Sequence, residues 1–174
     1  ASIKGTVVAR ISLKRKGGKF HAPPGALYRI TSGLGHFYCR GETTVALPAG
    51  SYEVLAFRGP EYRVSQAAFE LAAGQSAEVA IPLERWANAA AAGWHSGENH
   101  IHANYGYGHW YNTPRSILDL CEGEDLRVCN LVVANSDGDA VFDREFFRGR
   151  PDPLSTPDTI LYWNQEFRAT LWGH

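Results

Sequence analysis

The stretch GWHSGENHIHANYGYGHWYNTP, residues 93–114, carries four of the chain's seven histidines: His95, His100, His102 and His109. Within it, NHIHANY predicts a short β-strand. Residues i and i+2 of a strand face the same side, so the imidazoles of His100 and His102 can reach one cation. Neutral imidazole suits zinc, iron or manganese. The stretch alone is therefore compatible with a metal site or with a histidine pair on a solvated strand face.

The residues that follow predict a helix and a second strand. Thr113 is suited to the N-cap and Pro114 to the first helical position. The buried helix face is expected to consist of Ile117, Leu118, Leu120 and Cys121. LRVCNLVVANSDGD (126–139) has the nearly continuous apolar run of a buried parallel strand. Strand, helix and strand in this order predict a βα barrel or a doubly wound sheet, in which polar groups at the carboxyl ends of strands form the site.

The part of the chain before this stretch has a different pattern. From Ser2 to about Trp86, short alternating apolar runs are broken by turn residues, which predicts a small antiparallel sandwich. RKGGK (15–19) reads as a turn, and Pro48–Ser51 and Leu71–Gln75 each predict a hairpin. The alanine-rich segment 87–93 then acts as a linker or short helical turn. The predicted domains are therefore residues 1–86 and 87–174.

Composition limits the classes of partner. The formal net charge is −1, which gives no electrostatic reason to expect nucleic acid or an anionic membrane as a partner. No apolar run approaches the roughly 20 residues that span a bilayer. Because the given sequence starts at Ala1 without a methionine, we expect a secreted, periplasmic or extracellular protein whose signal peptide has been removed, with a trimmed chain as the alternative. Cys121 and Cys129 are close enough in sequence to bridge in an oxidising compartment, but spacing alone leaves this open.

Residues 93–174 resemble a known family. GWHSGENHIHANYG, NTPRSILDLCEGEDLRVCNLVVANSD and NQEFRATLWGH are similar to the opening of the CehA/McbA-like metal-dependent hydrolases of the PHP (polymerase and histidinol phosphatase) superfamily. The preceding segment, with LPAGSYEVLAFRGPEYR and LERW, resembles a carboxypeptidase-regulatory-like sandwich. The resemblance implies an α+β chain: an antiparallel β-sandwich followed by the first βα units of a TIM-like barrel.

The resemblance also implies a site that holds one to three divalent transition-metal ions (zinc, manganese or iron). Its metal ligands would be His100, His102, Glu166 and His174. Glu98 stands where the family usually has aspartate, and Asp137 lies about where many members have a histidine; both are candidate catalytic residues. Asp137 has the equal alternative of closing a turn with Gly138.

These candidates predict a hydrolase of an ester, amide, carbamate or phosphoester bond in a small molecule. The substrate-binding candidates lie in one aromatic and glycine-rich loop: Tyr105, His109, Trp110, Tyr111 and Asn112. A complete barrel needs roughly 200 residues or more. We therefore expect the rest of the barrel on another chain, in a missing C-terminal segment or in a homo-oligomer. The competing hypothesis is a non-catalytic extracellular assembly or binding protein.

Overall fold

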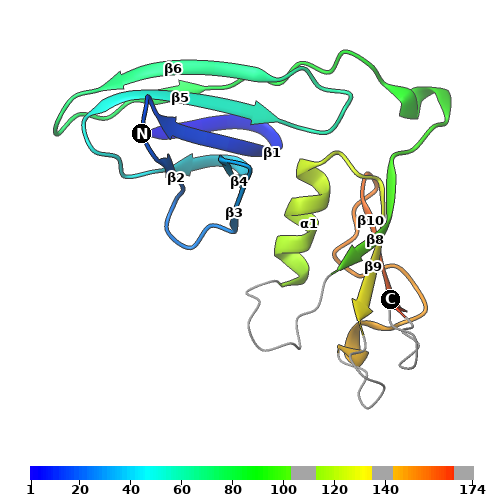
Figure 1. Ribbon diagram of the computed structural model, residues 1–174. Coiled ribbons are helices and arrows are strands. Elements are labelled where there is room, and N and C mark those ends of the chain that lie inside the picture. Colours follow the sequence, from blue (N-terminus) through cyan, green and yellow to red (C-terminus); the bar gives the residue numbers. More distant parts are fainter. Residues whose placement is uncertain (103–112, 135–142, 167–174) are drawn as a thin grey trace. The chain divides into compact units, whose positions relative to one another are not determined.

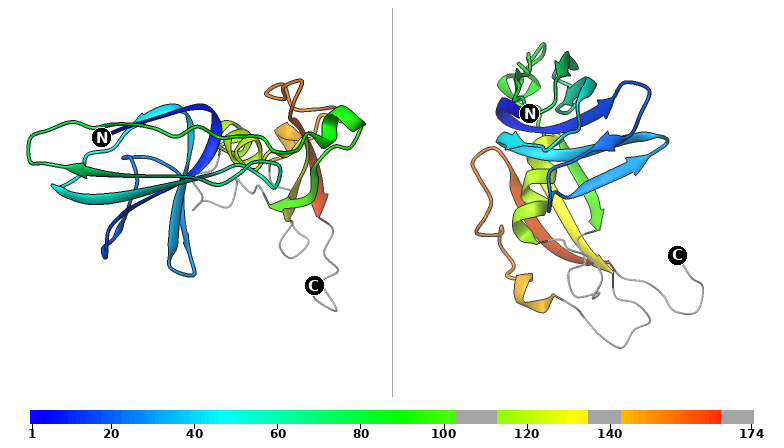
Figure 2. Two further views of the ribbon diagram at one scale, coloured as in Figure 1. Left: turned by 90° about the horizontal axis from the view of Figure 1, so that it is seen from above. Right: turned by 90° about the vertical axis from the view of Figure 1, so that its left-hand side faces the viewer.

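The computed structural model describes residues 1–102, 113–134 and 143–166. The chain divides into two compact units: residues 1–92 with 122–125, and residues 93–121 with 126–174. Each unit is built on a sheet of its own, and Figures 1 and 2 show the strands of each from three directions.

The first unit contains a seven-stranded mixed sheet in the order β3-β4-β1-β5-β6, with β2 and β7 also paired to β1. The strands are β1 (Ser2–Arg15), β2 (Phe20–His21), β3 (Tyr28–Thr31), β4 (Leu34–Thr44), β5 (Gly50–Phe57), β6 (Ser65–Leu71) and β7 (Glu78–Ala80). A short 3-10 helix, η1 (Ala89–Ala92), follows them, in the segment expected to be a linker or helical turn.

The long strand β1 organises this sheet by changing partners along its length. Its first three residues pair in parallel with β7, while Arg10 to Arg15 pair antiparallel with β5. Its register with β4 shifts between Lys4 and Val8. An irregularity of this kind bends a strand and increases its twist. One sheet therefore curls until it nearly closes on itself.

This architecture corrects the predicted antiparallel sandwich. The expected hairpin at Pro48–Ser51 is wrong, because β4 and β5 lie on opposite sides of β1 and do not pair with each other. The hairpin expected at Leu71–Gln75 is also wrong, because β7 crosses over to pair in parallel with β1. Turn residues mark where a strand ends but do not determine its partner. The turn at RKGGK is confirmed: β1 and β2 pair antiparallel around it, with Gly17 at φ 65°.

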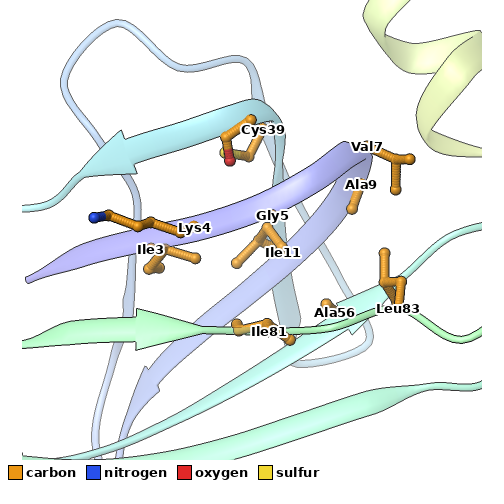
Figure 3. A pocket seen from close by; sticks show the side chains of 11 residues that line it. Ile3, Lys4, Gly5, Val7, Ala9, Ile11, Cys39, Ala56, Ile81 and Leu83 are labelled. Atoms are coloured by element: carbon orange, nitrogen blue, oxygen red, sulfur yellow. The ribbon is translucent and has the colours of Figure 1, made fainter.

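The core of the first unit is apolar and closely packed. Leu13, Phe37, Tyr52 and Val54 are at most 1% exposed. The hydroxyl of Tyr52 donates to the carbonyl oxygen of Pro48 at 2.7 Å, so this buried polar group is satisfied. A small cavity of about 10 Å³ lies beside the irregular part of β1 and holds at most about one water. Figure 3 shows the side chains that line it.

Cys39 lines that cavity, and its burial gives a test of this core. Burial raises the pKa of the Cys39 thiol from 9.0 to about 11. Since the thiolate is the reactive form, we expect iodoacetamide to alkylate Cys39 at pH 8 about 100-fold more slowly in the folded protein than in urea. The folded thiol keeps its proton to a higher pH, so its contribution to stability is full below pH about 9 and is lost towards about 11.

Peptide mass spectrometry separates Cys39 from the other two cysteines. Equal alkylation rates for Cys39 in the folded and the unfolded chain would contradict this description of the first core.

The described residues of the second unit form a three-stranded parallel sheet and most of one α-helix. Strands β8 (Gly97–His102), β9 (Val128–Ala134) and β10 (Ile160–Glu166) lie in the order β10-β9-β8. The helix α1 (Pro114–Gly123) follows β8, and the 3-10 helix η2 (Arg144–Phe146) precedes β10. The strand, helix and parallel strand predicted from the sequence are confirmed by β8, α1 and β9.

The start and the buried face of α1 are as predicted. The Thr113 side chain accepts a hydrogen bond from the Ser116 amide, while the Ser116 hydroxyl accepts one from the Thr113 amide. This reciprocal cap satisfies two amides at the helix start. The predicted apolar face packs against β9 and β10: Ile117, Leu118 and Cys121 are buried, and Leu120 is partly buried.

The predicted barrel is wrong. The described residues of the second unit contain three strands and one α-helix, without the repeated βα units of a TIM-like barrel. The described segment between β9 and β10 contains Pro151, Pro153 and Pro157, and forms η2 and turns instead of a second crossover helix. Proline removes a backbone donor and breaks helices, which explains why no α-helix forms there.

Cys39, Cys121 and Cys129 are all buried and none of them forms a disulfide. Cys121 and Cys129 both lie in the core of the second unit, where they pack as small apolar side chains.

Among the described residues, no helix combines the length and apolar character needed to cross a bilayer.

Candidate metal centre

The candidate site lies on the sheet face that α1 does not cover. Side chains alternate along a strand, so Cys129, Leu131 and Val133 of β9 face the helix and form the core. Asn130 and Val132 therefore face the other way. The register pairs Val132 with His102 on β8 and with Asn164 on β10, which places polar side chains from all three strands on this face.

His100 and His102 point towards each other at the carboxyl end of β8. Their ring centroids are 5.0 Å apart, and their Nε2 atoms are separated by 3.1 Å. Their side chains are 49% and 44% exposed. The i, i+2 spacing therefore does bring two imidazole nitrogens to one point that remains open on one side.

Glu166 completes the cluster from the last position of β10. Its side chain is only 7% exposed. Oε1 lies 3.6 Å from Nε2 of His100, and Oε2 lies 3.4 Å from Nε2 of His102. Glu166 is 64 positions after His102 in the sequence. The two residues come together because the parallel strands β8 and β10 end at the same edge of the sheet. One ligand atom from each residue lies within 4.8 Å of the others.

The three ligand atoms fit the requirements of a metal ion. Metal bonds to histidine nitrogen and carboxylate oxygen are about 2.0–2.2 Å long, which places neighbouring ligands of a tetrahedral site roughly 3.4 Å apart. The Nε2 atoms of His100 and His102 are 3.1 Å apart, and each lies near a different oxygen of Glu166, at 3.6 Å and 3.4 Å, so these three pairs lie around that value. With one ligand atom taken from each residue, all three atoms lie within 4.8 Å of one another. Two imidazoles and a carboxylate are also a donor set that zinc uses in catalytic sites. The residues present therefore can hold one divalent cation.

A β-bulge in β8 includes the first of the two histidines. Glu98 pairs with Cys129 and Ile101 with Leu131, so Asn99 and His100 together lie opposite Asn130. The Glu98 carboxylate is not part of the cluster of three ligands, and it accepts a hydrogen bond of 2.9 Å from the His100 amide. Sequence reasoning placed Glu98 among the catalytic residues and did not identify the bulge.

Two asparagines on the same face were also missed. The side-chain amide of Asn130 donates to the backbone carbonyl oxygen of Asn99 at 2.8 Å, and the side-chain amide of Asn164 donates to Oδ1 of Asn130. One signal in the sequence was available: Asn130 interrupts the apolar run VCNLVVA, where a buried strand would ordinarily continue with an apolar residue.

The remaining predicted site residues lie outside the described residues. They are Asp137, His174, Tyr105, His109, Trp110, Tyr111 and Asn112. Their roles stay predictions. His95 lies in the described part of the chain, where it is exposed.

Comparison with known proteins gives little beyond the geometry. No protein-family model and no curated protein matches the chain. Among solved structures, a fimbrial assembly protein from Parabacteroides distasonis is similar at 12% identity with a TM-score of 0.28. The match covers 62% of this chain and 57% of that one, so this chain spans a little over half the length of its structural neighbour.

Proposed function

We propose that the chain binds a divalent transition-metal ion, zinc, manganese or iron, through His100, His102 and Glu166. The observation that carries this proposal is the convergence of their ligand atoms within 4.8 Å. A buried carboxylate is costly unless positive charge or hydrogen bonds compensate it. A divalent cation would interact favourably with the buried carboxylate of Glu166, and the two imidazoles would complete its coordination without adding charge of their own.

We further propose that this centre belongs to a metal-dependent hydrolase, or to a part of one that another chain or segment completes. Bound there, the cation would lower the pKa of a coordinated water towards neutrality and polarise an ester, amide, carbamate or phosphoester bond. The half-exposed histidine rings leave one side of the cluster open for water and substrate. An open coordination position distinguishes catalytic sites from closed structural ones.

Zinc-dependent hydrolysis tests this proposal. Zinc-loaded protein is expected to cleave p-nitrophenyl acetate or bis(p-nitrophenyl) phosphate, and a chelator is expected to stop the reaction. Loss of a residue that only supports a ligand costs about 10–100-fold in activity, so Glu166→Gln should reduce the rate by at least about 100-fold. Gln165→Ala, an exposed neighbour on β10, is the matched control and should keep the rate.

A rate that is the same with zinc, with chelator and in Glu166→Gln would overturn the hydrolase proposal. Metal binding by an inactive protein would restrict the function to binding.

A second candidate function is a non-catalytic assembly or binding protein. The observation that favours it is the edge strand β3, in which all four residues are exposed. Tyr28 and Ile30 on this edge are 57% and 63% exposed. Exposed apolar edge strands are templates for pairing with another chain. Metal-free protein that self-associates, and that becomes monomeric in Ile30→Lys, would support this function over the hydrolase.

A further inference from the structure

The bulge in β8 leaves one peptide bond outside the regular ladder, and two side chains hold it. In a bulge the extra residue is unpaired, so its backbone groups need other partners. The backbone carbonyl oxygen of Asn99 accepts a hydrogen bond from the side-chain amide of Asn130 at 2.8 Å. The backbone amide of His100, on the other side of the same peptide bond, donates to Oε1 of Glu98 at 2.9 Å. The Asn99–His100 peptide plane is therefore fixed at both ends.

Asn164 holds one of these two partners from its other side. A carboxamide can turn over and exchange its oxygen for its nitrogen. The carbonyl oxygen of Asn99 can only accept, so the NH2 group of Asn130 must face it, and the side-chain amide of Asn164 donates to the opposite atom, Oδ1 of Asn130. The three asparagines come from three neighbouring strands, so the hydrogen bonds run across the whole sheet from β10 to β8.

This arrangement bears directly on the metal ligands because the held peptide bond leads into His100. Bulges redirect side chains, and they occur next to active sites. The His100 side chain is attached to Cα, the backbone atom that follows the amide nitrogen bound by Glu98. Its Nε2 atom then lies 3.1 Å from that of His102 and 3.6 Å from Glu166. A different orientation of the held peptide would change the backbone torsion φ of His100 and with it the direction in which the His100 side chain leaves the backbone.

We propose that Glu98, Asn130 and Asn164 are positioning residues that clamp the Asn99–His100 peptide and thereby aim His100 at His102 and Glu166. The function of the clamp rests on the metal binding proposed above, but its geometry does not. It assigns Glu98 a role different from that of a metal ligand or a general acid or base: the carboxylate is a hydrogen-bond acceptor for the backbone.

The zinc affinity of clamp variants, measured by competition with a chromophoric chelator, tests the proposal. Outer partners of metal ligands typically contribute about 10–100-fold in affinity, so Glu98→Ala and Asn130→Leu should each weaken zinc binding by about 10-fold. Glu98→Gln keeps an acceptor oxygen and should bind within about 2-fold of the unaltered protein. The double variant Glu98→Ala/Asn130→Leu should lose less than the product of the single losses, because both residues hold one peptide.

Tyr162→Phe is the matched control, since Tyr162 is the register partner of Asn130 on β10. It should leave zinc affinity unchanged. A Glu98→Gln variant as impaired as Glu98→Ala would overturn the clamp and return Glu98 to a direct chemical role. A loss of zinc affinity in the double variant equal to the product of the two single losses would also overturn the clamp.

A readout without metal separates the clamp from the proposed function. The imidazole ¹⁵N resonances of His100 in metal-free protein should shift in Asn130→Leu and remain in place in Tyr162→Phe. Unaltered protein that binds no zinc would overturn the proposed function, while these resonances would still decide the clamp. Unshifted His100 resonances in Asn130→Leu would overturn the clamp, whatever the zinc affinity.

Discussion

The variant His100→Ala/His102→Ala is expected to lose zinc binding, with an affinity at least about 1000-fold below that of the unaltered chain. Outer partners of a ligand alone contribute about 10–100-fold, and this variant removes two ligands themselves. Glu166 would remain as one carboxylate, which does not hold a transition metal tightly by itself. Elemental analysis after dialysis, together with chelator competition, measures the loss.

The fold should survive this change. Both imidazole side chains are close to half exposed, and surface substitutions usually alter stability by no more than about 0.5 kcal/mol. His95→Ala, an exposed histidine from the same segment, is the matched control and should keep full zinc affinity. Retention of one zinc ion per chain by the double variant would exclude His100 and His102 as the ligands.

Replacing Trp163 by alanine is expected to destabilise the second unit by about 3–5 kcal/mol, the usual range for a buried tryptophan. Trp163 on β10 is 4% exposed and stacks on Phe146 with ring centroids 4.8 Å apart. Its indole nitrogen donates to the buried carboxylate of Asp152 at 2.9 Å. The substitution leaves a cavity and removes a partner from a buried charge.

Urea unfolding of metal-free protein, followed by circular dichroism, gives the change in free energy. Hydrogen exchange at the amides of β9 and β10 then assigns the loss to the second unit. Trp163→Phe should be intermediate, because a phenyl ring fills most of the volume but cannot bind Asp152. Gln165→Ala, exposed on the same strand, should change stability by no more than about 0.5 kcal/mol. A loss below about 1 kcal/mol in Trp163→Ala would contradict the packing described for this core.

The parts of the fold that sequence predicted are those determined by local chemistry. The Thr113 cap, the apolar face of α1 and the apolar run of β9 each depend on residues within a few positions of one another. The meeting of His100 and His102 belongs to the same class, because strand alternation alone puts both on one side. The meeting with Glu166 needed strand order as well, and the resemblance supplied that expectation.

The parts that sequence did not predict depend on pairing between distant segments. Pro48–Ser51 shows that a turn is present, but the strands on either side of it both pair with β1 and not with each other. The parallel pairing of β7 with β1 joins residues more than 70 positions apart and has no local signal. The expected barrel failed in a similar way, because the resemblance implied further βα units that the proline-containing segment before β10 does not form.

The bulge at Asn99–His100 is the feature of the site that sequence reasoning could least provide. A two-residue alternation describes a regular strand, and it contains no information about an extra residue opposite Asn130. The asparagines that hold the bulge lie on β9 and β10, so their relation to β8 appears only after the sheet has formed.

X-ray absorption at the zinc edge, combined with anomalous diffraction from zinc-loaded crystals, tests the metal centre most directly. We expect one zinc ion bonded to Nε2 of His100, Nε2 of His102 and a carboxylate oxygen of Glu166, each at about 2.0–2.2 Å. A zinc ion bound elsewhere, or His100 and His102 rings that point apart with Glu166 distant from both, would contradict it.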